Sequence, residues 1–172
     1  MSDQGTPTDN PELEHARAAL QQGTSLAQHF GLCSETLHLL YVSALGHYEA
    51  GRYALAVHDL SRLLALDARH ADAWALIGNS LMREGQFAEA LEAWSMSLHL
   101  NPGFGSALQV TRTALALKDA DTASVGWVAM VKHASTPDQH ATVEDLAQRV
   151  LELRGKGPDA PLGVNQTRIP SA

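Results

Sequence analysis

The stretch Ala50-Gly51-Arg52-Tyr53-Ala54-Leu55-Ala56 returns 34 positions later as Glu84-Gly85-Gln86-Phe87-Ala88-Glu89-Ala90. Other positions between Leu37 and Phe104 match at the same offset: Leu40 with Trp74, Ala44 with Gly78, Leu60 with Trp94, Leu64 with Leu98, Leu66 with Leu100 and Asp67 with Asn101. Aromatic, small and turn-forming residues that agree at one spacing indicate a duplicated structural unit. This unit decides how the rest of the chain folds.

Each unit has the pattern of two helices joined at a glycine. In the first unit we expect helices over about 34–50 and 54–65, with the turn at Gly51. Gly78 lies inside a helix of the second unit, where glycine costs roughly 0.5–1 kcal/mol relative to alanine, so a close helix contact is expected there. A 34-residue period with this residue order resembles the tetratricopeptide repeat. That resemblance implies an all-α solenoid of about three helix pairs.

The flanking segments complete such a solenoid. After Pro102 the pattern weakens into a third, degraded repeat, in which Arg112 takes the place of Ala44 and Gly78. Pro137 opens a last helix, which would cap the exposed end of the repeats. The expected division is a disordered lead-in (1–11), an N-terminal helical segment (12–33), the repeat domain with its capping helix (34–153) and a disordered tail (154–172).

Composition excludes several classes of function. The net charge of −7 argues against nucleic-acid binding, because phosphates favour patches of Lys and Arg. Cys33 is the only cysteine, so no internal disulfide can form, and we expect a buried thiol in a reducing compartment. The N-terminus has no secretory pattern, and no run of 18 apolar residues is present. A cytoplasmic protein without a membrane span is therefore expected.

The residues that could carry catalysis or bind a metal form no known pattern. The pairs His29/His38 and His38/His47 are nine positions apart, which is not the i, i+4 spacing of helical zinc ligands. A phosphate-binding glycine loop and a nucleophile elbow are both missing from the sequence. We therefore expect no enzyme, no cofactor and no metal.

The repeat geometry points to a binding surface, because the first helices of stacked pairs line the concave side of a solenoid. Tyr41, Leu45 and Tyr48 recur at i, i+4 and i+7 and so share one helical face. This stripe could be core, but Leu37, Leu40 and Ala44 already fill the core positions, which favours a groove. The residues expected to bind a peptide there are His38, Tyr41, Val42, Leu45, Tyr48, Ala75, Leu76, Asn79, Met82, Arg83, Gln109 and Val110.

One repeat family shares the N-terminal third of this pattern. Gly23-Thr-Ser-Leu-Ala, then Ser34-Glu-Thr-Leu-His-Leu-Leu-Tyr41, then His47-Tyr48-Glu-Ala-Gly51-Arg-Tyr53 resemble the start of the class II chaperones of type III secretion translocators. The likeness covers roughly residues 23–134. It implies a bacterial cytoplasmic protein that holds an extended hydrophobic segment of a translocator in its groove. Tyr41, Tyr48 and Tyr53 look like family positions that line this groove, with Leu45 where an aromatic is common.

These observations favour a chaperone that keeps a hydrophobic secretion substrate soluble and secretion-competent. The alternative is a generic repeat scaffold that assembles other proteins and has no role in secretion. Residues 12–30 carry an apolar stripe without an evident partner in the repeats, so a homodimer through this segment is expected. The residues expected at that interface are Leu13, Ala16, Leu20, Leu26 and Phe30.

Overall fold

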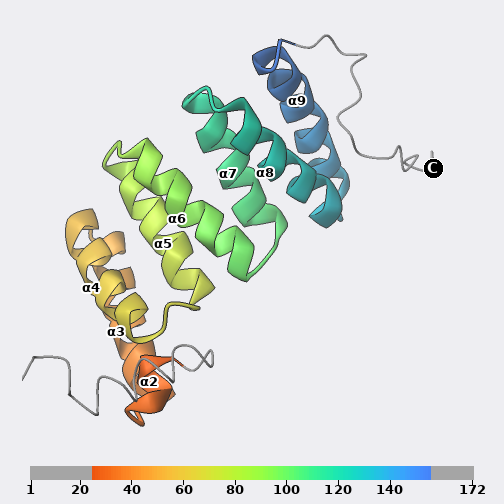
Figure 1. Cartoon of the computed structure of the whole chain (residues 1–172). Helices are drawn as coiled ribbons and strands as arrows, with labels where there is room; N and C mark the ends of the chain where they lie inside the picture. Colours follow the sequence, from red (N-terminus) through yellow and green to blue (C-terminus); the bar gives the residue numbers. More distant parts are fainter. Residues whose placement is uncertain (1–24, 156–172) are drawn as a thin grey trace, which may run out of the picture.

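The structure, a computed structural model, describes residues 25–155. This part of the chain is built from helices joined by short turns, and it contains no strand (Figure 1). The helices are α2 (Leu26–His29), α3 (Ser34–Glu49), α4 (Tyr53–Leu66), α5 (Ala71–Arg83), α6 (Phe87–Leu100), α7 (Phe104–Ala116), α8 (Ala120–His133) and α9 (Pro137–Leu153).

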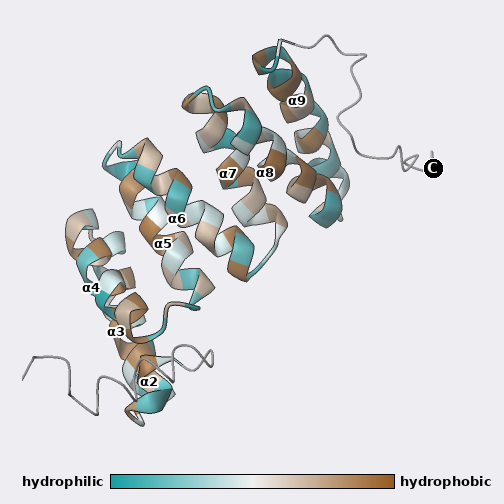
Figure 2. Ribbon diagram, viewed as in Figure 1, coloured by the Kyte–Doolittle hydropathy of each residue, from teal (hydrophilic) through white to brown (hydrophobic). Residues whose placement is uncertain are grey.

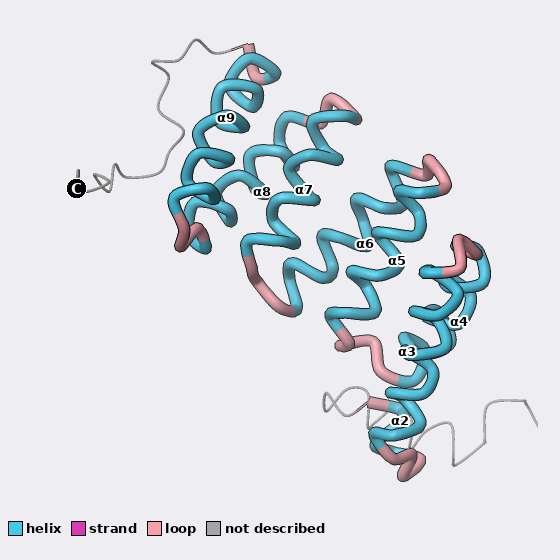
Figure 3. Tube along the Cα trace, turned by 180° about the vertical axis from the view of Figure 1, so that it is seen from behind, coloured by secondary structure: helices cyan, strands magenta, loops and turns pink. Residues whose placement is uncertain are grey.

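The helices pack as three antiparallel pairs in a row. In the order α3–α4, α5–α6 and α7–α8, each pair packs on the next through α4 against α5 and α6 against α7 (Figures 1 and 3). Helix α9 then covers the end of the row by packing on α8 and α7. The predicted all-α tetratricopeptide-repeat solenoid of three helix pairs with a capping helix is confirmed.

Three left-handed residues form the turns inside the pairs. Gly51 has φ +72° and Gly85 has φ +77°, conformations that glycine adopts without the steric cost a Cβ brings. The third pair makes the same turn at Lys118, with φ +61°. The missing glycine explains why this repeat is hard to recognise in the sequence.

The position of Lys118 also shows that the third repeat begins one residue earlier than a 34-residue period predicts, because the loop from α6 to α7 is one residue shorter than the loop from α4 to α5. Gly85 and Lys118 are 33 positions apart, and α7 likewise begins 33 positions after α5. The prediction that Arg112 replaces Gly78 is therefore wrong, since the residue at that place is Thr111. Thr111 is fully buried, whereas Arg112 is exposed.

Close helix contacts explain two buried glycines. A Cβ on Gly78 would lie 2.7 Å from Nε1 of Trp94 on α6. This contact explains why a glycine lies inside α5, as predicted from the sequence. In the third pair the small residue lies on the second helix instead, where a Cβ on Gly126 would lie 2.6 Å from Oγ1 of Thr111. The second and third pairs thus each have one glycine that leaves room for a residue of the partner helix.

The core runs between the helix layers along the whole row, and every helix from α3 to α9 contributes hydrophobic residues (Figure 2). Leu60 and Leu63 of α4 and Met130 of α8 are completely buried. Burying a side chain of this size contributes roughly 1.5–3 kcal/mol. Helix α9 adds Val143, Leu146 and Val150 to the core.

Several predictions concern the ends of the chain. Leu13, Ala16 and Leu20 lie outside the described residues, and so does the lead-in 1–11. Of the tail 154–172, the structure describes only Arg154 and Gly155. Within the described part, Leu26 is half-buried and Phe30 is 59% exposed. Cys33 is exposed, which corrects the expectation of a buried thiol, because the chain between α2 and α3 runs along the surface.

Candidate peptide-binding face

The exposed sides of α3, α5 and α7 face away from the second helix of each pair, and we call this surface the inner face. On α7, Ala107, Val110, Thr111 and Ala114 are buried, so Leu108 and Arg112 lie on its opposite side. On α5, Ala75, Asn79 and Met82 lie opposite the buried residues in the same way. On α3 only Ala44 is buried, so its inner-face residues are identified by the 34-residue spacing from α5; Tyr41, Leu45 and Tyr48 are partly buried and also pack against the core. The inner face comprises His38, Tyr41, Leu45 and Tyr48 of α3, Asp72, Ala75, Asn79, Met82 and Arg83 of α5, and Leu108, Arg112 and Leu115 of α7; each is half-buried or exposed.

Tyr41 is held in place by the turn between α4 and α5. Its ring stacks on the imidazole of His70, with ring centroids 5.4 Å apart and an interplanar angle of 24°. His70 itself caps α5, since its Nδ1 accepts a hydrogen bond from the backbone N–H of Ala73 at 3.2 Å. Partial burial raises the pKa of Tyr41, and the charge of Asp72 adds to this effect. The Tyr41 hydroxyl thus stays protonated and can donate a hydrogen bond to a ligand.

A second aromatic group joins the first and second repeats. Tyr48 meets Tyr53 edge-to-face, with centroids 5.5 Å apart and planes at 61°. Arg83 of α5 lies beside them, and a hydrogen bond to Tyr48 raises the pKa of its guanidinium, with a further contribution from Tyr53. Aromatic rings next to an arginine give a surface that can hold both apolar and polar parts of a peptide.

Further along the inner face, α5 and α7 meet through sulfur. The Thr113 hydroxyl donates to Sδ of Met82 at 3.7 Å, and Thr113 is itself buried. Methionine is flexible and polarizable, so it adapts to ligands of different shape. Ala75 is much smaller than Tyr41, which holds the equivalent position on α3, and Asn79 is polar where α3 has Leu45.

The structure brings together most of the predicted peptide-binding residues and relocates some. Leu76 and Val110 belong to the core, with 5% and 1% exposure, which corrects the prediction that they line the surface. Gln109 is half-buried at the edge of α7, and Val42 is 47% exposed beside the inner face. The sequence prediction missed three inner-face residues, Leu108, Arg112 and Leu115, because it carried the 34-residue spacing into a repeat whose spacing is 33.

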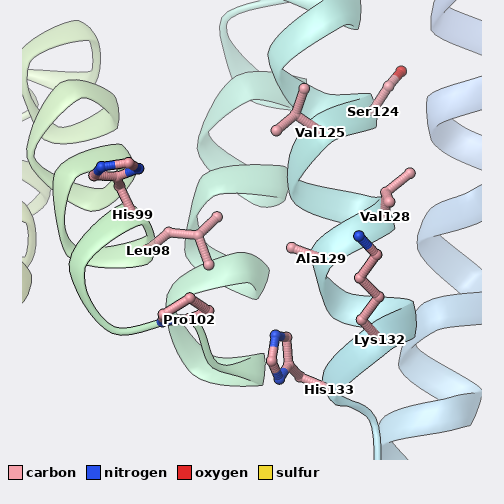
Figure 4. Close-up of a pocket in the computed structure, with 9 residues that line it drawn as sticks. All are labelled: Leu98, His99, Pro102, Ser124, Val125, Val128, Ala129, Lys132 and His133. Atoms are coloured by element: carbon pink, nitrogen blue, oxygen red, sulfur yellow. The ribbon is translucent and has the colours of Figure 1, made fainter.

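An open hollow of about 730 Å³ lies on the other side of the solenoid, between α6 and α8 (Figure 4). Its lining is mostly aliphatic, with Val125, Val128 and Lys132 lying along α8. One repeat earlier, α6 carries Glu92 and Ser95 at the places of Val125 and Val128, so the apolar lining is particular to this junction. The remaining lining residues are Leu98, His99, Pro102, Ser124, Ala129 and His133.

Within residues 25–155, His, Cys, Asp and Glu side chains form no group of three that could hold a metal ion. None of the helices described here has the length and apolar character needed to span a bilayer.

Comparison with known proteins bears directly on this fold. The tetratricopeptide repeat family model matches residues 71–104, the second helix pair. No curated protein sequence matches the chain significantly. A type III secretion complex from Aeromonas hydrophila superposes with a TM-score of 0.69 at 22% identity, covering 85% of this chain and 97% of that one.

Two further solved structures agree. The Yersinia enterocolitica type III secretion chaperone SycD, in complex with a peptide of the translocator YopD, has a TM-score of 0.59 at 19% identity and covers 72% of this chain and 95% of its own. PcrH of Pseudomonas aeruginosa, in complex with the chaperone binding region of PopD, has a TM-score of 0.59 at 23% identity and covers 73% and 96%. The chain shares the fold of these chaperones.

Proposed function

We propose that this protein is a type III secretion chaperone that binds an extended hydrophobic segment of a translocator-type protein on its inner face. The observation that carries the proposal is the cluster of Tyr41, Leu45 and Tyr48 on the first helix pair of a fold shared with translocator chaperones. Its task would be to keep the segment soluble until secretion.

The chemistry of the inner face supports an extended peptide as ligand. An extended chain directs alternate side chains to opposite sides, so every second residue can rest against Tyr41, Leu45 or Met82. Tyr and Arg side chains can then hydrogen-bond to the peptide backbone, whose donors and acceptors would otherwise be left without partners. Removing the ligand's apolar residues from water would prevent their aggregation in the cytoplasm.

A binding experiment on the purified full chain tests the proposal. Random peptides of 16 residues are displayed on phage and selected on the immobilised protein, and the affinity of the enriched peptides is measured by fluorescence anisotropy. We expect peptides rich in apolar residues. The variant Tyr48→Ala should weaken them about 10-fold or more, because truncating an aromatic anchor typically costs over 1 kcal/mol.

Val125→Ala is the matched control, because Val125 is 64% exposed in the hollow on the opposite side. If Tyr48→Ala binds as tightly as the wild type while Val125→Ala loses affinity, the inner face is not the site. Circular dichroism must show that both variants keep the helical content of the wild type.

A scaffold without a role in secretion is the second candidate, and the apolar hollow between α6 and α8 favours it, since it offers a separate surface for another protein. Co-expression separates the two functions. A chaperone should raise the soluble yield of a co-expressed translocator, and Tyr48→Ala should abolish this gain. A scaffold should leave the yield unchanged.

A further inference from the structure

Arg112 occupies the middle of the inner face on the third repeat. The 33-residue spacing places it where α5 has Asn79, and the 34-residue spacing of the first two repeats places Leu45 there on α3. The three repeats thus present an apolar, an amide and a cationic side chain at one equivalent position. Neither Leu45 nor Asn79 is charged, so the positive charge of Arg112 is particular to the third repeat.

The surroundings of Arg112 are apolar. Leu108 and Leu115 lie about one turn before and after it, and both pack on the core shared by α7, α8 and α9. Among the residues that the structure describes, neither Arg112 nor Arg83 has a carboxylate within 4.0 Å. The two guanidinium groups therefore face solvent with their charge available.

The acidic groups of the inner face lie elsewhere. Asp72 is at the start of α5, near Tyr41, whose pKa rises through burial and also through the charge of this carboxylate. An acidic peptide side chain would be repelled at that end of the inner face and attracted at α7. The charge pattern therefore disfavours a ligand carboxylate at the start of α5, and of the two guanidinium groups Arg112 is the one flanked by leucines on its own helix.

Desolvation makes this preference strong. A hydrophobic peptide lying across Leu108 and Leu115 would remove water from the Arg112 guanidinium, and an unpaired buried charge is strongly unfavourable. An Asp or Glu on the peptide would form a bidentate pair with the guanidinium and offset that cost.

We infer that the peptide bound on the inner face carries a carboxylate side chain that pairs with Arg112, in addition to apolar residues that contact Tyr41, Leu45 and Tyr48. This inference rests on the proposed function and narrows its ligand class to apolar segments with one acidic residue at a set distance from the apolar anchors. Arg112 acts as a specificity determinant, since it would reject purely apolar segments.

The peptide selection described above tests the inference when it is repeated on Arg112→Gln and Arg112→Glu. We expect one position with Asp or Glu enriched in peptides selected on the wild type, no such enrichment on Arg112→Gln, and enrichment of Lys or Arg at that position on Arg112→Glu. Replacing the acidic residue of a selected peptide by its amide should weaken wild-type binding about 10-fold and leave binding to Arg112→Gln nearly unchanged.

Arg62→Gln serves as the matched control, because Arg62 is an exposed arginine on α4, a second helix, and its loss should leave the selected sequences unchanged. Apolar peptides that depend on Tyr48 but show no acidic position would overturn the inference and leave the proposed function standing. An acidic position that persists in Arg112→Gln would also overturn it. Failure to select any peptide that depends on Tyr48 would overturn the proposed function as well.

Discussion

Replacing Gly78 by alanine sets two opposing effects against each other. Alanine in a helix interior is favoured over glycine by roughly 0.8–1 kcal/mol. The new methyl group, however, would lie 2.7, 2.8 and 2.9 Å from three atoms of the Trp94 indole, closer than real Cβ atoms come to their neighbours. Trp94 is a rigid side chain of only 6% exposure, so it cannot swing away.

Overpacking of this kind typically costs about 1–3 kcal/mol, and here several atoms of one ring are involved. We therefore expect Gly78→Ala to lower the free energy of unfolding by about 1–2 kcal/mol net. Urea denaturation followed by circular dichroism measures this change as a lower midpoint at an unchanged slope.

Gly46 provides the matched control, because it also lies inside a helix but a Cβ there meets nothing within 4 Å. Gly46→Ala should raise the free energy of unfolding by about 0.5–1 kcal/mol. Adding Trp94→Leu to Gly78→Ala should recover part of the loss, which a double-mutant cycle would report as favourable coupling. Stabilisation by Gly78→Ala equal to that by Gly46→Ala would refute the reasoning.

Three other predictions follow from local contacts. Burial opposes a lower pKa of Asp59, but the hydrogen bond that Ser43 donates to its carboxylate at 3.0 Å lowers it. The stability that this bond contributes is present above the unfolded-state pKa of Asp59 and is lost as pH falls through its folded-state pKa. Ser43→Ala should therefore make the free energy of unfolding, measured with urea at a series of acidic pH values, fall less steeply with decreasing pH. The Thr36 hydroxyl, 3.3 Å from Sγ, lowers the pKa of Cys33, so Thr36→Val should slow alkylation by iodoacetamide near neutral pH; an unchanged rate would contradict this role. A chain beginning at Ser34 should sediment as a monomer if residues 12–30 form a dimer, and a persisting dimer would place the interface elsewhere.

The fold could be predicted from the sequence because the matched residues do the packing. Gly78 and Trp94 touch, Gly51 and Gly85 adopt positive φ, and each residue type is required by the contact or turn that it makes. The loss of one residue from the loop before the third repeat could not be predicted in this way. Lys118 makes the turn without glycine, so the residue that would mark the new spacing is missing from the pattern.

That shorter loop also explains the errors at the candidate site. With the wrong spacing, Arg112 fell on a core position, and Val110 was placed on the surface although it is buried. Leu76 was misplaced for another reason, since it lies at the border between the buried and exposed sides of α5. Hydrophobicity alone does not separate these sides when leucine can occupy either.

In helix α3, too, hydrophobicity does not show which side is buried, and the packing of the neighbouring helices decides it. Of its sixteen residues only Ala44 is buried, although leucine, valine and tyrosine occur all around the helix. Leu39 is 68% and Val42 47% exposed, because no helix of the described chain packs on that side as α9 packs on the third pair. An exposed apolar strip of this kind is uncommon on the surface of a folded protein. The side of the first pair that carries Leu39 and Val42 is therefore the part of the apolar surface of α3 that the described helices leave uncovered, whereas the side around Ala44 is packed by α4 and α5.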